Sequence, residues 1–153
     1  MASVFGIGEI TKNRKLDGKL NEEINKIDKD INEIFEKFRD REPAAYAIIP
    51  LGIETLTDLI KRTLNDIEKY KNLLQSYRLN LNNFPEVFQL ENSIKEISKR
   101  LEEGRKQIYN LSRGMKLIQI IQDINQDIEI KLHKIQNFWN IHKNKLHRLR
   151  IIE

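Results

Sequence analysis

The residues of this sequence best suited to chemistry are its three histidines, because an imidazole can bind a metal or exchange a proton near neutral pH. They are His133, His142 and His147, and no two stand three or four residues apart, the spacing that places two ligands on one helix face. Glu129 and His133 are four apart, but they could share a metal only with ligands from other helices. The chain has no cysteine, which excludes disulfides and cysteine-type zinc sites. We therefore predict no metal and no cofactor.

His142 lies between Trp139 and Leu146 on an apolar helical stripe. This position predicts a partly buried, hydrogen-bonded histidine near the end of a helix bundle. The alternative is a pH-sensing role, because small changes in environment move a histidine pKa across the physiological range.

Carboxylates are the second candidates for chemistry. They alternate with lysine and asparagine, which predicts solvent-exposed helix faces with ion pairs between neighbouring turns. General acid–base catalysis needs carboxylates in a pocket with shifted pKa values, and no Gly-rich phosphate loop or Ser-His-Asp set is present. We therefore predict that the protein is not an enzyme. The carboxylates concerned are Glu22, Glu23, Asp28, Asp30, Glu102 and Glu103.

The C-terminal stretch 131–150 is basic, with six lysines and arginines and no acidic residue. Cations at a helix C-terminus are favoured by the helix dipole, so a solvated helix end is one interpretation. The other is a weak, salt-dependent contact with phosphate, on nucleic acid or an anionic surface. The candidate contacts are Lys131, Lys134, Lys143, Lys145, Arg148 and Arg150.

Four long helices are needed to position these residues. The chain of 153 residues has only six glycines and three prolines, and a third of its residues are charged. This composition is typical of long helices. Apolar residues recur at alternating steps of four and three, as in Leu20, Ile24 and Ile27, which is a coiled-coil-like seam. The sequence predicts an all-α fold, an antiparallel four-helix bundle in one domain, 1–153. An N-terminal arm (1–13) precedes helices at 16–41, 51–79, 85–113 and 115–150.

Residues 115–149 contain no proline or glycine and have a wide apolar side, including Ile118 and Ile141, which predicts the central helix of the bundle. Gly104 falls on the seam of the preceding helix, where a glycine gives either a close helix approach or a weak point. Gly114 is a plausible helix end. The alternative is that helices 85–113 and 115–150 are fused into one long helix.

Three short apolar patches are left over from the seams and suit contacts between chains. The first, in the N-terminal arm, could instead insert into a membrane surface. The candidate inter-subunit residues are Val4, Phe5, Ile7, Ile10, Tyr46, Ile48, Ile49, Ile151 and Ile152.

No stretch approaches the roughly 18 apolar residues of a transmembrane helix, and the N-terminus lacks the basic and apolar regions of a secretory signal. We expect a cytoplasmic or otherwise intracellular protein, or a component of a viral particle.

A short apolar N-terminus containing Gly6 and Gly8, followed by four helices, is similar to the membrane-acting bundles of cell-death effectors. The stretch Leu101-Glu-Glu-Gly104 also resembles one in some plant members. The resemblance implies permeabilisation led by the N-terminal segment, although the highly charged helix 16–41 departs from the apolar first helix of that group.

These features favour a non-enzymatic structural or scaffolding protein that binds protein partners and self-associates in an oligomer or particle. A nucleic-acid-binding helical protein is the second interpretation, and a membrane-acting bundle is the third.

Overall fold

The computed structural model describes residues 14–39, 49–110 and 115–152. Within these ranges the chain forms four long α-helices that pack against one another, one short 3-10 helix and no strand. The all-helical prediction is therefore confirmed for this part of the chain. The elements are α2 (Arg14–Arg39), α3 (Ile49–Ser76), η2 (Leu81–Asn83), α4 (Pro85–Asn110) and α5 (Met115–Arg148).

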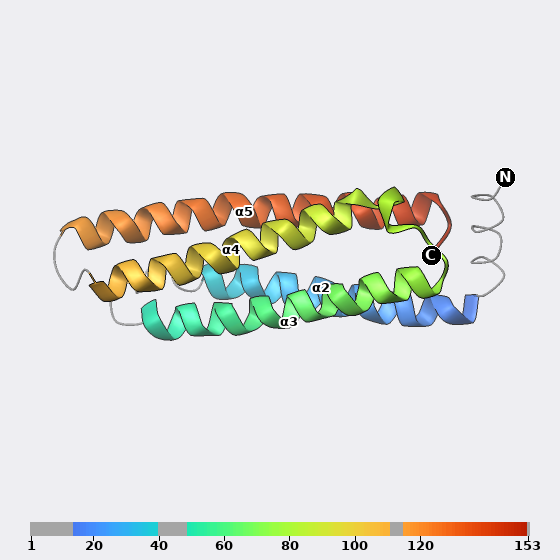
Figure 1. Cartoon of the computed structure of the whole chain (residues 1–153), viewed down its shortest axis with the longest axis horizontal. Coiled ribbons are helices and arrows are strands. Elements are labelled where there is room, and N and C mark those ends of the chain that lie inside the picture. Colours follow the sequence, from blue (N-terminus) through green and yellow to red (C-terminus); the bar gives the residue numbers. More distant parts are fainter. Residues whose placement is uncertain (1–13, 40–48, 111–114, 153) are drawn as a thin grey trace.

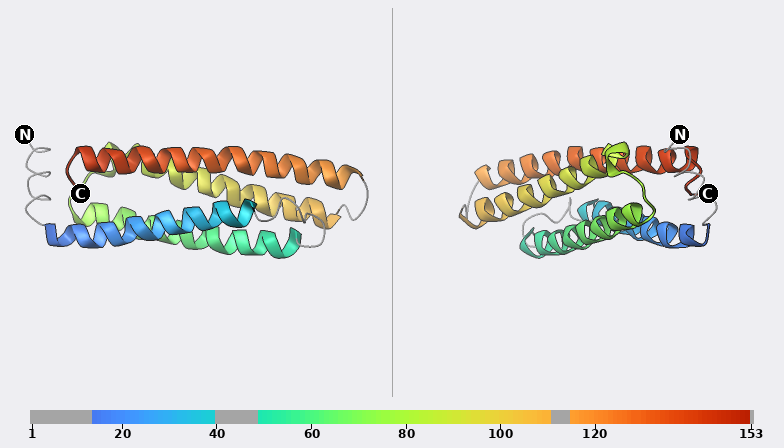
Figure 2. Two further views of the ribbon diagram at one scale, coloured as in Figure 1. Left: turned by 180° about the vertical axis from the view of Figure 1, so that it is seen from behind. Right: turned by 45° about the vertical axis from the view of Figure 1, so that its right-hand side comes forward.

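Each helix lies beside its neighbours in the sequence, α2 against α3, α3 against α4 and α4 against α5 (Figure 1). The colours run back and forth along the long axis, and the views from behind and from an oblique angle agree (Figure 2). The alternative of one continuous helix through Gly114 is wrong, because α4 and α5 fold back and pack side by side. The apolar faces of α4 and α5, which a single straight helix would leave uncovered, therefore cover each other.

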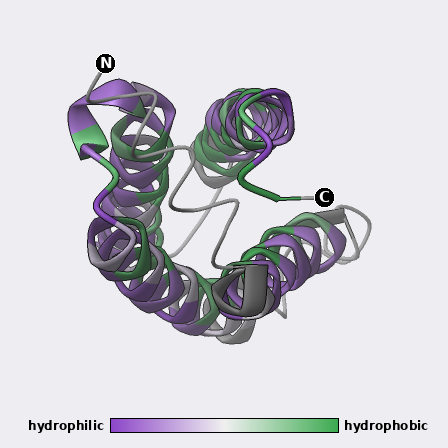
Figure 3. Cartoon of the chain, turned by 90° about the vertical axis from the view of Figure 1, so that its right-hand side faces the viewer, coloured by the Kyte–Doolittle hydropathy of each residue, from purple (hydrophilic) through white to green (hydrophobic). Residues whose placement is uncertain are grey.

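The core runs along the inner sides of the helices, where the end-on view shows apolar residues facing one another (Figure 3). On α2 every predicted seam residue is buried, from Leu20 to Phe38. Burying a Leu or Ile side chain stabilises a fold by roughly 1.5–3 kcal/mol, so this single stripe is a major contribution to the packing of α2. The buried seam residues of α2 are Leu20, Ile24, Ile27, Ile31, Ile34 and Phe38.

Gly104 is the point of close approach between α4 and α5. A Cβ atom at this position would lie 2.7 Å from Cδ1 of Ile124. One turn earlier, Arg100 Nε lies 3.3 Å from Asp127 Oδ2 across the same interface. The seam glycine predicted from the sequence therefore permits close packing of two helices.

Helices α3 and α5 end in the same type of turn, with an arginine in the left-handed region. Arg78 has φ 62° and Arg150 has φ 57°. At the end of α5 the amide of Arg150 donates to the His147 carbonyl (3.0 Å), and that of Ile151 donates to the Leu146 carbonyl (2.9 Å). This is the Schellman pattern, in which the residue after the left-handed position packs back onto the last helical turns.

The turn at Arg150 overturns one expectation. Ile151 and Ile152, predicted as contacts between chains, are buried in the core of this chain, with exposed fractions of 0% and 5%. The reversal of the backbone directs both side chains back onto the bundle instead of leaving them on the surface.

Helix α5 is also less enclosed than its wide apolar side suggested. It packs along α4, and it reaches α2 and α3 through side chains such as Trp139 and His142. Ile118 and Ile141, predicted on its buried side, are 39% and 41% exposed. The expectation that both belong to the core is therefore wrong, because the described helices leave both side chains partly open to solvent.

Candidate functional site

The six basic residues proposed as phosphate contacts fall into two groups. Three of them form ion pairs within the chain: Lys131 with Asp127 (3.0 Å), Lys143 with Asp28 (3.0 Å) and Lys145 with Glu86 (3.3 Å). Lys134, Arg148 and Arg150 are exposed, and no carboxylate of the described residues lies within ion-pairing distance of them. Half of the predicted charge is thus engaged in contacts within the chain.

Asp28 joins α2 to α5 through two different donors. The indole Nε1–H of Trp139 donates to Asp28 Oδ1. The ammonium of Lys143 lies 3.0 Å from Oδ1 and 3.2 Å from Oδ2 of the same carboxylate. Asp28 was predicted on a solvent face, and the structure instead places it at a contact between two helices.

His142 is fully buried where α3, α5 and the α3–α4 connection meet. Its Nε2 shares a hydrogen bond with the Tyr70 hydroxyl. Its ring stacks on Trp139 at 5.7 Å and meets the ring of Phe84 edge-on at 5.6 Å. The predicted hydrogen bond is present, and the burial is complete where partial burial was expected.

The pKa of His142 is lowered to about 4, chiefly by burial; Glu86 opposes this effect, and Lys145 makes a smaller contribution that also lowers the pKa. His142 Nδ1 and Glu86 Oε2 are both buried without a hydrogen-bond partner in the described part of the chain. The imidazole is therefore neutral at neutral pH and enclosed by aromatic rings. It does not face an open cleft where it could act on a substrate.

A second buried polar cluster lies between α2 and α3. Glu23 and Asp30, predicted on solvent-exposed faces, are buried, and so is Asp66 of α3. Burial and hydrogen bonding with Asp30 raise the pKa of Asp66 to about 7. Arg62 lies 2.7 Å from Asp30 and compensates part of the negative charge. The expectation was wrong because Glu23 and Asp30 flank the α2 seam on the side that α3 covers.

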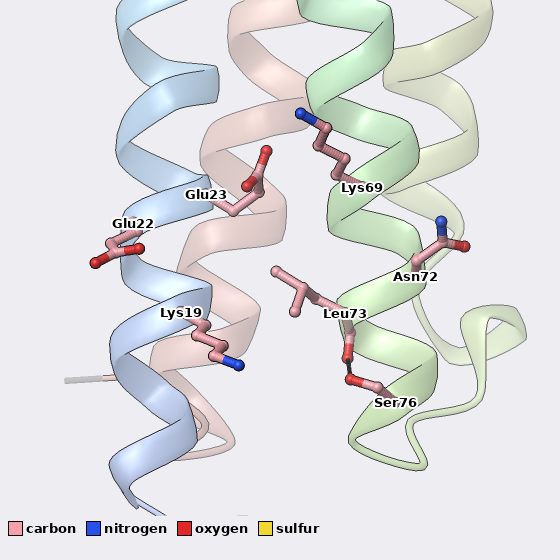
Figure 4. A pocket seen from close by; sticks show the side chains of 7 residues that line it. All are labelled: Lys19, Glu22, Glu23, Lys69, Asn72, Leu73 and Ser76. Atoms are coloured by element: carbon pink, nitrogen blue, oxygen red, sulfur yellow. Dashed lines mark hydrogen bonds between the residues drawn. The ribbon is translucent and has the colours of Figure 1, made fainter.

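An open groove of about 450 Å³ lies beside this cluster, between α2 and α3 (Figure 4). Charges of both signs line it. The Ser76 hydroxyl donates to the Leu73 carbonyl at 2.7 Å, so its proton is engaged in capping the helix. In the ranges that the structure describes, no three carboxylates or histidines are arranged to hold a metal ion. The lining residues are Lys19, Glu22, Glu23, Lys69, Asn72, Leu73 and Ser76.

A second groove, of about 520 Å³, lies between α3 and α4 and was not expected from the sequence. Four lysines and two glutamates line it, so its charge is moderately positive. No single stretch of sequence contains a signal for it, because its lysines come from two helices that are adjacent only in the folded chain. They are Lys61, Lys95, Lys99 and Lys106.

Most of the predicted inter-subunit residues lie outside the described residues. These are Val4, Phe5, Ile7, Ile10, Tyr46 and Ile48. Ile49 is the first residue of α3, but its side chain is not among those that the structure describes. These contacts therefore remain predictions.

The exposed large apolar side chains of the described ranges gather on two neighbouring helices. Five are between 37% and 87% exposed, and all belong to α4 or α5. Ile130, the most exposed isoleucine among them, was not singled out from the sequence because it lies off the predicted seam. The five are Phe88, Tyr109, Ile118, Ile130 and Ile141.

Comparison of the chain with protein-family models, curated proteins and solved structures finds no match. Among the described helices, none combines the length and the apolar character needed to cross a membrane. The geometry of the chain itself is therefore the basis for a functional proposal.

Proposed function

We propose that this chain is a non-enzymatic structural subunit, an antiparallel four-helix bundle with coiled-coil-like seams that associates with other chains through the outer faces of its helices. Partners include further copies of itself. In this role the core holds the helices as a rigid rod, and the outer faces of α4 and α5 supply the contacts.

The observation that carries this proposal is the placement of the exposed apolar side chains. All five of those in the described ranges lie on α4 and α5, and none lies on α2 or α3. Single exposed apolar residues scattered over a surface are ordinary, whereas their restriction to two neighbouring helices, with Ile130 and Ile141 on the same side of α5, favours a contact surface there. The side formed by α4 and α5 is thus the best candidate for binding another chain.

The polar residues support the same proposal. Asp28 holds Trp139 and Lys143, and Glu86 holds Lys145, so these groups connect helices. These ion pairs are partly exposed to solvent, so each adds little net stability, and their contribution is to link one helix to another. Side chains used in this way favour a scaffold over a catalytic site.

The test is sedimentation equilibrium of the full chain from low to high micromolar concentration. We expect reversible self-association, which should weaken when Ile130 and Ile141 are replaced by serine. The matched control replaces two exposed polar residues of α2, Glu22 and Lys26, by serine and should leave association unchanged. A monomer over the whole range, with no other protein bound after purification from its source, would contradict the proposal.

A second candidate is nucleic-acid binding through Lys134, Arg148 and Arg150. The supporting observation is that these three are exposed and have no ion-pair partner among the described residues. With about three phosphate contacts, affinity for DNA should fall roughly 40-fold between about 50 and 200 mM salt. No binding at low salt would contradict this candidate, and so would binding that salt does not weaken.

A further inference from the structure

The outer side of α5 carries a straight stripe of exposed residues. At 3.6 residues per turn, eleven residues make about three full turns, so residues eleven apart stand almost in line. Ile130 and Ile141 have this spacing and are 51% and 41% exposed. Asp123, Lys134, Asn137 and Arg148 lie on the same side and are also exposed. The stripe is Asp123, Ile130, Lys134, Asn137, Ile141 and Arg148.

This stripe is complementary to itself when it is reversed. The midpoint between Ile130 and Ile141 falls between residues 135 and 136, and so does the midpoint between Asp123 and Arg148. A two-fold axis at this point would place Ile130 of each copy opposite Ile141 of the other. It would also place each Asp123 carboxylate opposite an Arg148 guanidinium. A two-fold interface requires this kind of self-complementarity.

We propose that two copies of the chain pair through this stripe, with their α5 helices antiparallel and the axis between residues 135 and 136. The inference rests on the proposed structural function and names the surface, the partner and the register. The pairing contains two Ile130–Ile141 contacts at its middle and an Asp123–Arg148 ion pair at each end.

The charges of the stripe favour this partner over a polyanion. Asp123 accepts only a long hydrogen bond, at 3.4 Å, from Gln119 within the described chain. Arg148 has no ion-pair partner there, so both charges are available to a second copy. A nucleic acid would meet a carboxylate at one end of the stripe and isoleucines in its middle. Lys134, close to the axis, faces Asn137 in this register and gains no opposite charge.

Cysteine cross-linking tests the register directly, since the chain has no cysteine of its own. We would mix Ile130→Cys protein with affinity-tagged Ile141→Cys protein under a mild oxidant. Each mixed pair would lie within the roughly 7 Å between Cα atoms that a disulfide allows. Two cysteines at position 130, one in each copy, would be separated by about 16 Å along the axis, from eleven residues at roughly 1.5 Å each.

We expect the mixed dimer to form in clear excess over either homodimer. Ile118→Cys is the control, because Ile118 is exposed on the same helix but on another side of it. Its mixtures with Ile130→Cys should give no cross-link. Homodimers of Ile130→Cys in excess would overturn the antiparallel register, and so would equal yields from the control mixture.

Charge reversal provides an independent test by sedimentation equilibrium. Asp123→Arg or Arg148→Asp alone should weaken the dimer by about three- to tenfold, because two exposed pairs become repulsive. The double variant should return to the wild-type affinity. Lys134→Gln should leave the dimer intact or tighten it, whereas nucleic-acid binding would weaken.

Failure of the double variant to recover would overturn the register. The two proposals fail differently: a monomer at every concentration removes the self-association itself, whereas an oligomer with the wrong cross-links removes only this surface.

Discussion

The hydroxyl of Tyr70 on α3 and the Nε2 atom of His142 on α5 share a hydrogen bond with both side chains fully buried. Seventy-two residues separate the two in sequence. Burial raises the pKa of Tyr70 well above its ordinary value and lowers that of His142 to about 4. Both groups are therefore neutral at neutral pH, and the contact is sensitive to acid.

The first prediction concerns this acid sensitivity. The folded-state pKa of His142 is lowered, so its contribution to stability is present above about pH 6.5 and is lost as pH falls through about 4. Between pH 7 and pH 4 we expect the free energy of unfolding of the wild type to fall by about 1–3 kcal/mol more than that of His142→Gln. Urea unfolding followed by circular dichroism measures this free energy at each pH. His147→Gln is the control, because His147 is exposed. An unchanged pH dependence in His142→Gln would contradict the prediction.

The second prediction has the opposite sign. The pKa of Asp66 is raised from 3.8 to about 7, so its contribution to stability is complete below pH 3.8 and is lost as pH rises through 7. Asp66→Asn should therefore be more stable than the wild type at pH 8, by about 1–2 kcal/mol. Asp58→Asn, at an exposed position of the same helix, should have no such effect. Urea unfolding of both variants at pH 5 and pH 8 tests this prediction. Equal changes in the free energy of unfolding for Asp66→Asn and Asp58→Asn would count against it.

The third prediction concerns the close approach of α4 and α5. A Cβ at residue 104 would contact Cδ1 of Ile124, and valine at 124 lacks that methyl group. We expect Gly104→Ala and Ile124→Val each to lower the free energy of unfolding by about 1 kcal/mol. The double variant should be less destabilised than the sum of the two. Gly18→Ala is the control, since a Cβ at Gly18 would have no atom within 4 Å of it. It should stabilise the protein through helix propensity, and strict additivity at 104 and 124 would contradict the packing argument.

The fourth prediction concerns the end of α5. Arg150 holds a left-handed backbone conformation, with φ 57°, that glycine adopts at lower cost. Arg150→Gly should therefore stabilise the protein by about 1 kcal/mol, seen as a higher midpoint of urea unfolding. Asn144→Gly should destabilise it by a smaller amount, because Asn144 is exposed and lies in the interior of the helix. The prediction is wrong if both variants lower the midpoint.

The sequence was most informative where a periodic pattern predicts burial. Leu20, Ile24 and Ile27 are buried as the alternating steps predict, because a residue on the seam faces the core whichever helix covers it. Of the two alternatives for Gly104, a close approach or a weak point, the structure shows the close approach, although the partner atom in Ile124 could not be known from the sequence. These features are local, so one stretch of sequence contains the signal.

Features that depend on which helix covers which side were less predictable. Glu23 and Asp30 looked solvent-exposed because their neighbours are charged, and they are buried because α3 packs on that flank. Ile151 and Ile152 looked like surface residues because no glycine marks the left-handed turn at Arg150. The stripe on α5 was not predicted because Ile130 lies outside the apolar seam, and exposed apolar residues follow no periodic pattern that marks them.

Trp139 allows the packing of three helices to be followed by fluorescence. It is the sole tryptophan of the chain, and it touches Asp28 of α2, Tyr70 of α3 and His142 of its own helix. Its fluorescence therefore comes from one known corner where three helices meet. Separation of α2 would shift the emission to longer wavelength, and protonation of the stacked imidazole would quench it, so the wild-type protein carries its own optical reporter.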